Sequence, residues 1–110
     1  MKEIISEEIL PQVMKTRDAG QKEYAQDVEN VFANFERIAK SLNSTREKVL
    51  MTYLLKHIDG ITAYVNGHQS QREDVRGRIT DIIVYLMLLW GMVETKDTQT
   101  VGTITSPFED

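Results

Sequence analysis

Two long segments with helical apolar spacing, each opened by the same helix-start motif, constrain the fold of this chain most strongly. The stretches Ser44–Glu47 ("STRE") and Ser70–Glu73 ("SQRE") both place a glutamate three residues after a serine. This is the capping box, in which each side chain accepts a hydrogen bond from the other residue's backbone N–H. The motifs predict one helix from Thr45 to Asn66, ending at Gly67, and another from Gln71 to Val93.

Apolar residues recur along both segments at intervals of three and four, as they do on the buried face of a helix. The expected buried row of the first segment is Leu50, Leu54, Ile58, Ile61 and Val65. The expected buried row of the second is Val75, Ile79, Ile82, Leu86, Leu89 and Val93. Because a short connection joins them, we expect the two helices to pack against each other antiparallel.

Two shorter helices are expected before these, from Pro11 to Gln26 and from Asn30 to Leu42, with Asn30 as a cap. Proline has no N–H, so Pro11 is expected in a first turn. From Thr95 onward the sequence is polar, and "QTVGTIT" could form a short extended strand or stay a tail. The expected fold is all-α: a compact antiparallel bundle of about four helices over residues 1–94, followed by a non-helical polar tail over 95–110.

Composition excludes several classes of protein. The chain has 110 residues, a net charge of −4 and no cysteine, which fits one domain without disulfides or cysteine-based zinc sites. An acidic chain without a long basic run is a poor binder of duplex DNA. Its longest apolar stretch, Ile79–Val93, contains Asp81 and is shorter than the roughly 20 residues that span a bilayer. The N-terminus lacks the apolar core of a signal peptide. We therefore expect a cytoplasmic protein that does not enter membranes.

Polar and aromatic side chains flank the two expected apolar rows. They form stripes at helical spacing, namely Tyr53, His57, Gly60 and Tyr64, then Lys56, Asp59, Ala63 and Asn66, and finally Asp74, Arg78, Asp81 and Tyr85. If the apolar rows face each other, the flanking stripes can line one groove. Cations there would meet phosphate, and rings would stack on a base, so the groove suits a nucleotide.

The candidate ligand-binding residues are Tyr53, Lys56, His57, Asp59, Arg72, Arg78, Asp81 and Tyr85. Structural roles stay open beside this interpretation, because charges on helix flanks are commonly solvated and His57 could be a packed core residue. Gly60 costs its helix about 1 kcal/mol relative to alanine, which suggests close approach of a helix or ligand. Phe32, Phe35 and Trp90 are expected in the core or in a subunit interface.

Three segments, "EYAQDVENVFANFERIAKSLN", "YLLKHIDGITAYVNG" and "REDVRGRITDIIVYLMLL", together resemble small phage and prophage proteins related to the all-α, MazG-like nucleotide pyrophosphohydrolases. The resemblance covers about residues 23–93. It implies a helical bundle, usually oligomeric, that handles nucleotides in the cytoplasm of an infected or lysogenic bacterial host.

Catalytic members of that superfamily hold Mg²⁺ with two acidic pairs, Glu-x-x-Glu and Glu-x-x-Asp. Asp81 matches the last aspartate, but Arg78 stands three residues before it, and Lys56 with Asp59 has the first spacing with a cation in place of one acid. A lysine or arginine contacts phosphate directly, so this departure favours binding over hydrolysis. An Mg²⁺ site built differently stays open, from Asp59, Asp74 and Asp81 with Glu23, Asp27 or Glu36.

Three functions follow as hypotheses. The first is a phage-type protein that binds a nucleotide or cyclic nucleotide, either to sequester a host signalling nucleotide or to support nucleotide modification. The second is an Mg²⁺-dependent nucleoside triphosphate pyrophosphohydrolase. The third is a helical adaptor that binds a protein partner. Met87, Leu88 and Trp90 widen the apolar surface of the last helix, so we expect a homo-oligomer under all three.

Overall fold

The computed structural model describes residues 1–20, 30–68 and 74–99, with the backbone alone for 96–99. Its elements in chain order are α1 (Lys2–Ile4), the π-helical η1 (Ile5–Ile9), α2 (Leu10–Gly20), α3 (Ala33–Ser41), α4 (Arg46–Val65) and α5 (Val75–Gln99). All regular structure in these ranges is helical, which confirms the expected all-α fold.

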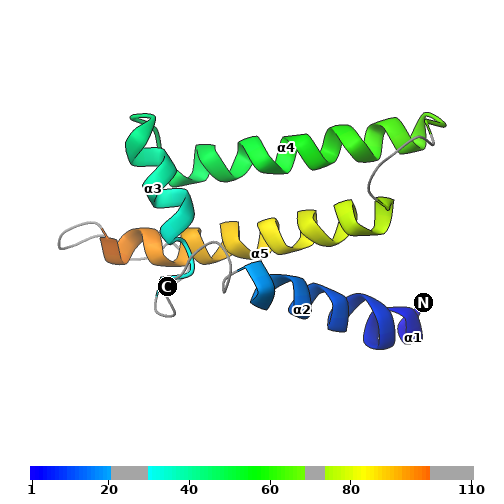
Figure 1. Ribbon diagram of the computed structural model, residues 1–110. Coiled ribbons are helices and arrows are strands. Elements are labelled where there is room, and N and C mark those ends of the chain that lie inside the picture. Colours follow the sequence, from blue (N-terminus) through cyan, green and yellow to red (C-terminus); the bar gives the residue numbers. More distant parts are fainter. Residues whose placement is uncertain (21–29, 69–73, 100–110) are drawn as a thin grey trace.

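Helices α4 and α5 run antiparallel and form the centre of the bundle (Figure 1). Helix α2 packs on α5, and α3 packs on α4 near the end where α4 begins. The antiparallel bundle expected from the sequence is therefore confirmed. No helix in the described ranges combines the length and the apolar character needed to cross a membrane.

The two ends of α4 depend on local capping. Its N-cap is Thr45, whose Oγ1 accepts from the N–H of Lys48 (3.2 Å), so the expected cap at Ser44 is wrong by one residue. The N–H of Ser44 instead donates to the Ala39 carbonyl (2.8 Å) and closes the end of α3. At the other end Gly67 has φ +89°, a left-handed conformation that glycine adopts without strain. The expected stop at Gly67 is confirmed.

Helix α5 begins later and ends later than expected. Asp74 lies outside the helix and its carboxylate accepts from the N–H of Arg76 (2.8 Å), so the described helix begins at Val75. The expected start at Gln71 and the Ser70–Glu73 cap lie outside the described residues. The helix continues to Gln99, so the non-helical tail does not begin at Thr95.

The hydrogen bonds of the Thr95 side chain explain why α5 continues beyond this residue. Thr95 Oγ1 donates to the Gly91 carbonyl (2.9 Å) and accepts from Arg46 (3.1 Å), which satisfies its hydroxyl inside the helix. Residues 100–110, with most of the suggested strand "QTVGTIT", lie outside the described residues.

The first helical run begins at Lys2, so Pro11 does not stand in a first turn. A proline ring crowds the carbonyl four residues earlier and provides no N–H. The wider π-helical turn η1 lies directly before Leu10 and gives that ring room. Asn30 does not cap α3 itself, because its Oδ1 accepts from Phe32 (3.0 Å) in a turn before the helix begins at Ala33. The expected end at Gln26 lies outside the described residues.

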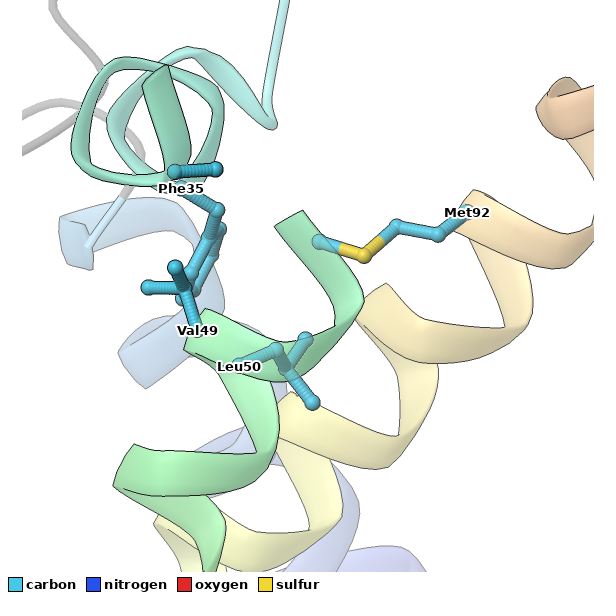
Figure 2. Close-up of a cluster of buried hydrophobic side chains, with 5 residues drawn as sticks. Phe35, Val49, Leu50 and Met92 are labelled. Atoms are coloured by element: carbon cyan, nitrogen blue, oxygen red, sulfur yellow. The ribbon is translucent and has the colours of Figure 1, made fainter. Parts of the chain in front are cut away.

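The core lies where α3 crosses α4 and α5. Figure 2 shows Phe35 of α3, Val49 and Leu50 of α4, and Met92 of α5 converging there, and Leu50 and Met92 have no exposed surface. Phe35 is buried as expected, whereas the side chain of Trp90 is mostly exposed. Most of the buried side chains thus gather near one end of the α4–α5 pair.

The expected apolar rows are only partly buried. Leu50 and Leu54 belong to the core, but five members of the rows are exposed, namely Ile58, Val65, Ile79, Leu86 and Val93. The residues buried farther along α4 and α5 are His57, Gly60, Thr80 and Val84. His57 and Gly60 are buried because α5 lies against them, with Asp81 beside His57 and Arg78 across Gly60. The expected rows are therefore only partly right, since five of their members are exposed.

Candidate functional site

A cavity of about 590 Å³ lies among α2, α3, α4 and α5. Pockets of roughly 300–1,000 Å³ hold small molecules in many proteins. Its lining from α2, from the turn before α3 and from α3 itself is Gln12, Lys15, Thr16, Arg17, Ala19, Gly20, Val31, Asn34 and Phe35. Its lining from α4 and α5 is Tyr53, Lys56, His57, Asp81, Val84, Tyr85 and Leu88.

Five of the residues expected to bind a ligand line this cavity together: Tyr53, Lys56, His57, Asp81 and Tyr85. Residues four apart on a helix lie on one face, which explains why each helix presents a pair. Because α4 and α5 are antiparallel, the two pairs meet, with the rings of Tyr53 and Tyr85 stacked and His57 beside Asp81.

Of the other three residues expected to bind a ligand, Asp59 and Arg78 do not line the cavity and Arg72 lies outside the described residues; Asp74, expected only at an Mg²⁺ site, does not line the cavity either. Asp59 is exposed on α4 and absent from the lining. Asp74 caps α5 through Arg76. Arg78 lies across Gly60, where a Cβ added to the glycine would stand 2.5 Å from the Arg78 Cζ. Gly60 therefore permits the close approach of an arginine side chain between α4 and α5.

Aromatic rings form one wall of the cavity. Tyr53 and Tyr85 are stacked with their centroids 6.2 Å apart, and Phe35 meets both rings edge-on at 6.1 and 6.3 Å. The imidazole of His57 lies 5.7 Å from the Tyr85 ring. Such a wall is apolar but presents ring faces and edges, against which a planar ligand group can pack.

His57 and Asp81 form the buried polar part of the same wall. His57 Nε2 lies 3.5 Å from Asp81 Oδ2, and their side chains are 10% and 29% exposed. Nδ1 of His57 is buried and makes no hydrogen bond within the part of the chain that the structure describes. The aspartate that interrupts the apolar run of α5 therefore faces a histidine of α4 at the cavity.

Cations exceed anions in the lining. Lys15 and Arg17 come from α2 and Lys56 from α4, whereas Asp81 is the one acidic residue of the described lining. Both lysines are exposed, and Arg17 also pairs with Asp18 at 2.9 Å. An anionic group at this cavity would thus meet cations from two helices.

Sequence reasoning gave no site role to α2, because the docking of this helix on α5 brings its cations to the cavity. One signal in the sequence points to α2. Its middle carries the polar run Lys15–Asp18, and in the structure Val13 is its one buried residue. A polar helix that nonetheless packs into a bundle has polar side chains available to line a cleft.

A second polar cluster, which sequence reasoning also missed, is centred on Arg46 and does not line the cavity. This buried guanidinium donates to Glu36 (2.9 Å), to the Met92 carbonyl (3.2 Å) and to Thr95 (3.1 Å), and it lies over the Phe32 ring. It joins α3, α4 and α5. A cation in the first turn of a helix opposes the helix dipole, which is the sequence signal that Arg46 has specific partners.

Three of the carboxylates proposed for Mg²⁺ have separate protein partners, and the fourth described one, Asp59, is exposed on α4. Glu36 accepts from Arg46 and Asn30, Asp74 caps α5, and Asp81 faces His57. In the described ranges no three histidine, aspartate or glutamate side chains are grouped closely enough to hold a metal ion. Glu23 and Asp27 lie outside those ranges.

We compared the chain with models of protein families, with curated proteins and with solved structures, and none of the three comparisons gave a match.

Proposed function

We propose that this chain binds a nucleotide in the cavity among α2, α3, α4 and α5. One observation carries the proposal: cations from two helices and a wall of aromatic rings line the same cavity. Phosphate is recognised by charge-assisted hydrogen bonds, and bases are recognised by contact with rings. A nucleotide presents both an anionic phosphate and a planar base.

Lys15 and Lys56 would contact the phosphates, with Arg17 beside them. Both lysine ammonium groups are exposed, so each can turn toward an anion without breaking a buried contact. Arg78 is not assigned to phosphate, because its guanidinium lies against Gly60.

The base would lie against Tyr85 and Tyr53, with Asp81 as a hydrogen-bond acceptor. A carboxylate accepts from the amino group of a base or from a ribose hydroxyl. The Asp81 side chain is 29% exposed, so its partial burial strengthens such a bond by reducing the competition from water. Asp81 would thus favour ligands with a donor at that position.

We further propose that the nucleotide is bound and not hydrolysed. Hydrolysis by carboxylate-held Mg²⁺ needs several acids directed at one ion. Glu36, Asp74 and Asp81 instead have protein partners in different parts of the bundle. The resemblance to phage-type, MazG-like proteins supports a nucleotide or cyclic nucleotide as ligand. The role would be to sequester a host signalling nucleotide or to support nucleotide modification.

The test is a calorimetric titration of nucleotides into the full chain and two double variants. Lys15→Ala with Lys56→Ala is expected to weaken binding at least ~100-fold, since it removes two charge-assisted bonds of about 1.5–3 kcal/mol each. Lys40→Ala with Lys48→Ala is the matched control, because both lysines are exposed and neither lines the cavity. Equal losses in the two variants would show nonspecific attraction and refute the site.

A further inference from the structure

The uncovered side of α4 carries an apolar stripe. Met51, Leu55, Ile58 and Val65 are 38–74% exposed, and Thr62 occupies the remaining position. The five residues are spaced by four, three, four and three. This is the spacing at which side chains of one helix insert between those of another helix.

A second stripe follows α5. Ile79, Leu86, Trp90 and Val93 are 43–71% exposed. Between Ile79 and Val93 the one charged residue is Asp81, which turns toward His57. The exposed stripe of α5 is therefore free of charge over four helical turns.

The two stripes turn toward the same side of the α4–α5 pair. On α4 the stripe is rotated by roughly 150° from Tyr53, His57 and Gly60, which face α5. On α5 the stripe is rotated by roughly 120°, in the same sense, from Arg78 and Asp81, which face α4. The two helices are antiparallel, so rotations in the same sense about their own axes bring both stripes to the same side of the helix pair. We call these eight exposed apolar side chains the open face.

We infer that the open face binds a second copy of this chain and forms a symmetric helical dimer. An aromatic side chain such as Trp90 has roughly 150–250 Å² of surface and the seven aliphatic ones have less, so these eight half-exposed side chains present on the order of 500–600 Å² of apolar area. Stable complexes bury roughly 800 Å² per partner. A lone soluble chain rarely leaves so much contiguous apolar area in water.

A second copy is the occupant that fits best. In a two-fold dimer the same surface covers itself, so an apolar face meets an equally apolar face, with Glu94 at its edge accepting from Trp90 (3.2 Å). The helical spacing of the α4 stripe suits another helix, and each copy supplies two. The cavity is lined from the side that α2 and α3 cover, so each copy keeps its own cavity, and this inference does not rest on nucleotide binding.

Trp90 provides a direct measurement, because it is the chain's one tryptophan and is 71% exposed in the isolated chain. Sedimentation and light scattering of the full chain are expected to give a dimer, with Trp90 emission shifted to the blue. Dilution should shift the emission to the red as the mass falls to that of one chain. A monomer at every concentration, with solvent-exposed emission throughout, would overturn the inference.

Charge on the open face is the second arm of the test. Ile58→Glu and Leu86→Glu are each expected to weaken association at least ~100-fold, since each adds two buried charges per dimer. Leu42→Glu is the matched control, because Leu42 is 68% exposed at the end of α3 and outside the face. Association that resists both open-face variants would assign the interface elsewhere. A chain that stays monomeric but binds lipid vesicles would replace the second copy with a membrane surface.

Discussion

Replacement of Arg46 by methionine should destabilise the bundle more than any surface change. The guanidinium is buried, and it joins Glu36 of α3 to the Met92 carbonyl and Thr95 of α5. Methionine is apolar and unbranched and keeps the packing on the Phe32 ring, so the substitution chiefly removes charge and hydrogen bonds.

The expected loss of unfolding free energy depends on the Glu36 carboxylate, which the substitution leaves without its cationic partner. Removing one partner of a buried ion pair costs about 3–5 kcal/mol. Glu36 retains its bond from Asn30 (2.7 Å), and 31% of its side chain is in solvent, so we expect the lower end, about 3 kcal/mol. For a domain of this size that corresponds to a fall in Tm of about 12 °C.

The assay is thermal and urea unfolding followed by far-ultraviolet circular dichroism, at a fixed protein concentration because association shifts Tm. Arg37→Met is the control, since Arg37 is exposed on the same helix as Glu36 and should change stability by less than ~0.5 kcal/mol. Adding Glu36→Gln to Arg46→Met should restore part of the loss by removing the unpaired charge. A loss below about 1 kcal/mol, or a double variant less stable than Arg46→Met, would refute this reasoning.

Two further predictions concern the cavity and the helix pair. Gly60→Ala should gain less in urea unfolding than the about 1 kcal/mol of helix propensity, because the new methyl group must displace the end of the Arg78 side chain. Gly20→Ala has no neighbour within 4 Å and should be neutral or stabilising; equal effects would contradict the packing argument. Asp81→Asn should weaken nucleotide binding about 10-fold in calorimetry with an unchanged circular dichroism spectrum, because one acceptor oxygen becomes a donor. An unchanged Kd would remove Asp81 from ligand contact.

Local signals in the sequence predicted the helices but not all of their ends. Gly67 ends α4 because its left-handed conformation is a local property, readable from the residue type. The end of α5 could not be predicted locally, since the bond from Arg46 to Thr95 joins residues distant in the sequence. Ser44 and Thr45 are both residue types that cap helices well. Thr45 is the cap here because the N–H of Ser44 donates to the Ala39 carbonyl at the end of α3.

Apolar periodicity predicted that α4 and α5 have apolar faces, but it could not tell what covers them. Ile58 and Leu86 have the spacing of buried residues and are exposed in the single chain. His57 and Gly60 are buried instead, because Asp81 and Arg78 of the neighbouring helix lie against them. The sequence shows that a helix has an apolar face. Only the tertiary arrangement shows whether another helix of the same chain covers that face.

The candidate site was predictable where two neighbouring helices make it. Tyr53 and His57 are one turn apart on α4, and Asp81 and Tyr85 are one turn apart on α5, so an antiparallel pair brings them together. The contribution of Lys15 was not predictable, because it depends on how the polar helix α2 docks.

The most direct test of the proposed function is native mass spectrometry of the full chain with a panel of linear, cyclic and ADP-ribose-type nucleotides, with and without Mg²⁺. We predict that one panel member is retained at one molecule per chain, with its mass unchanged in both conditions. The Lys15→Ala, Lys56→Ala variant should lose this ligand, and the Lys40→Ala, Lys48→Ala control should keep it. Retention of no nucleotide, or release of pyrophosphate from one, would contradict the proposal that this cavity binds a nucleotide and leaves it intact.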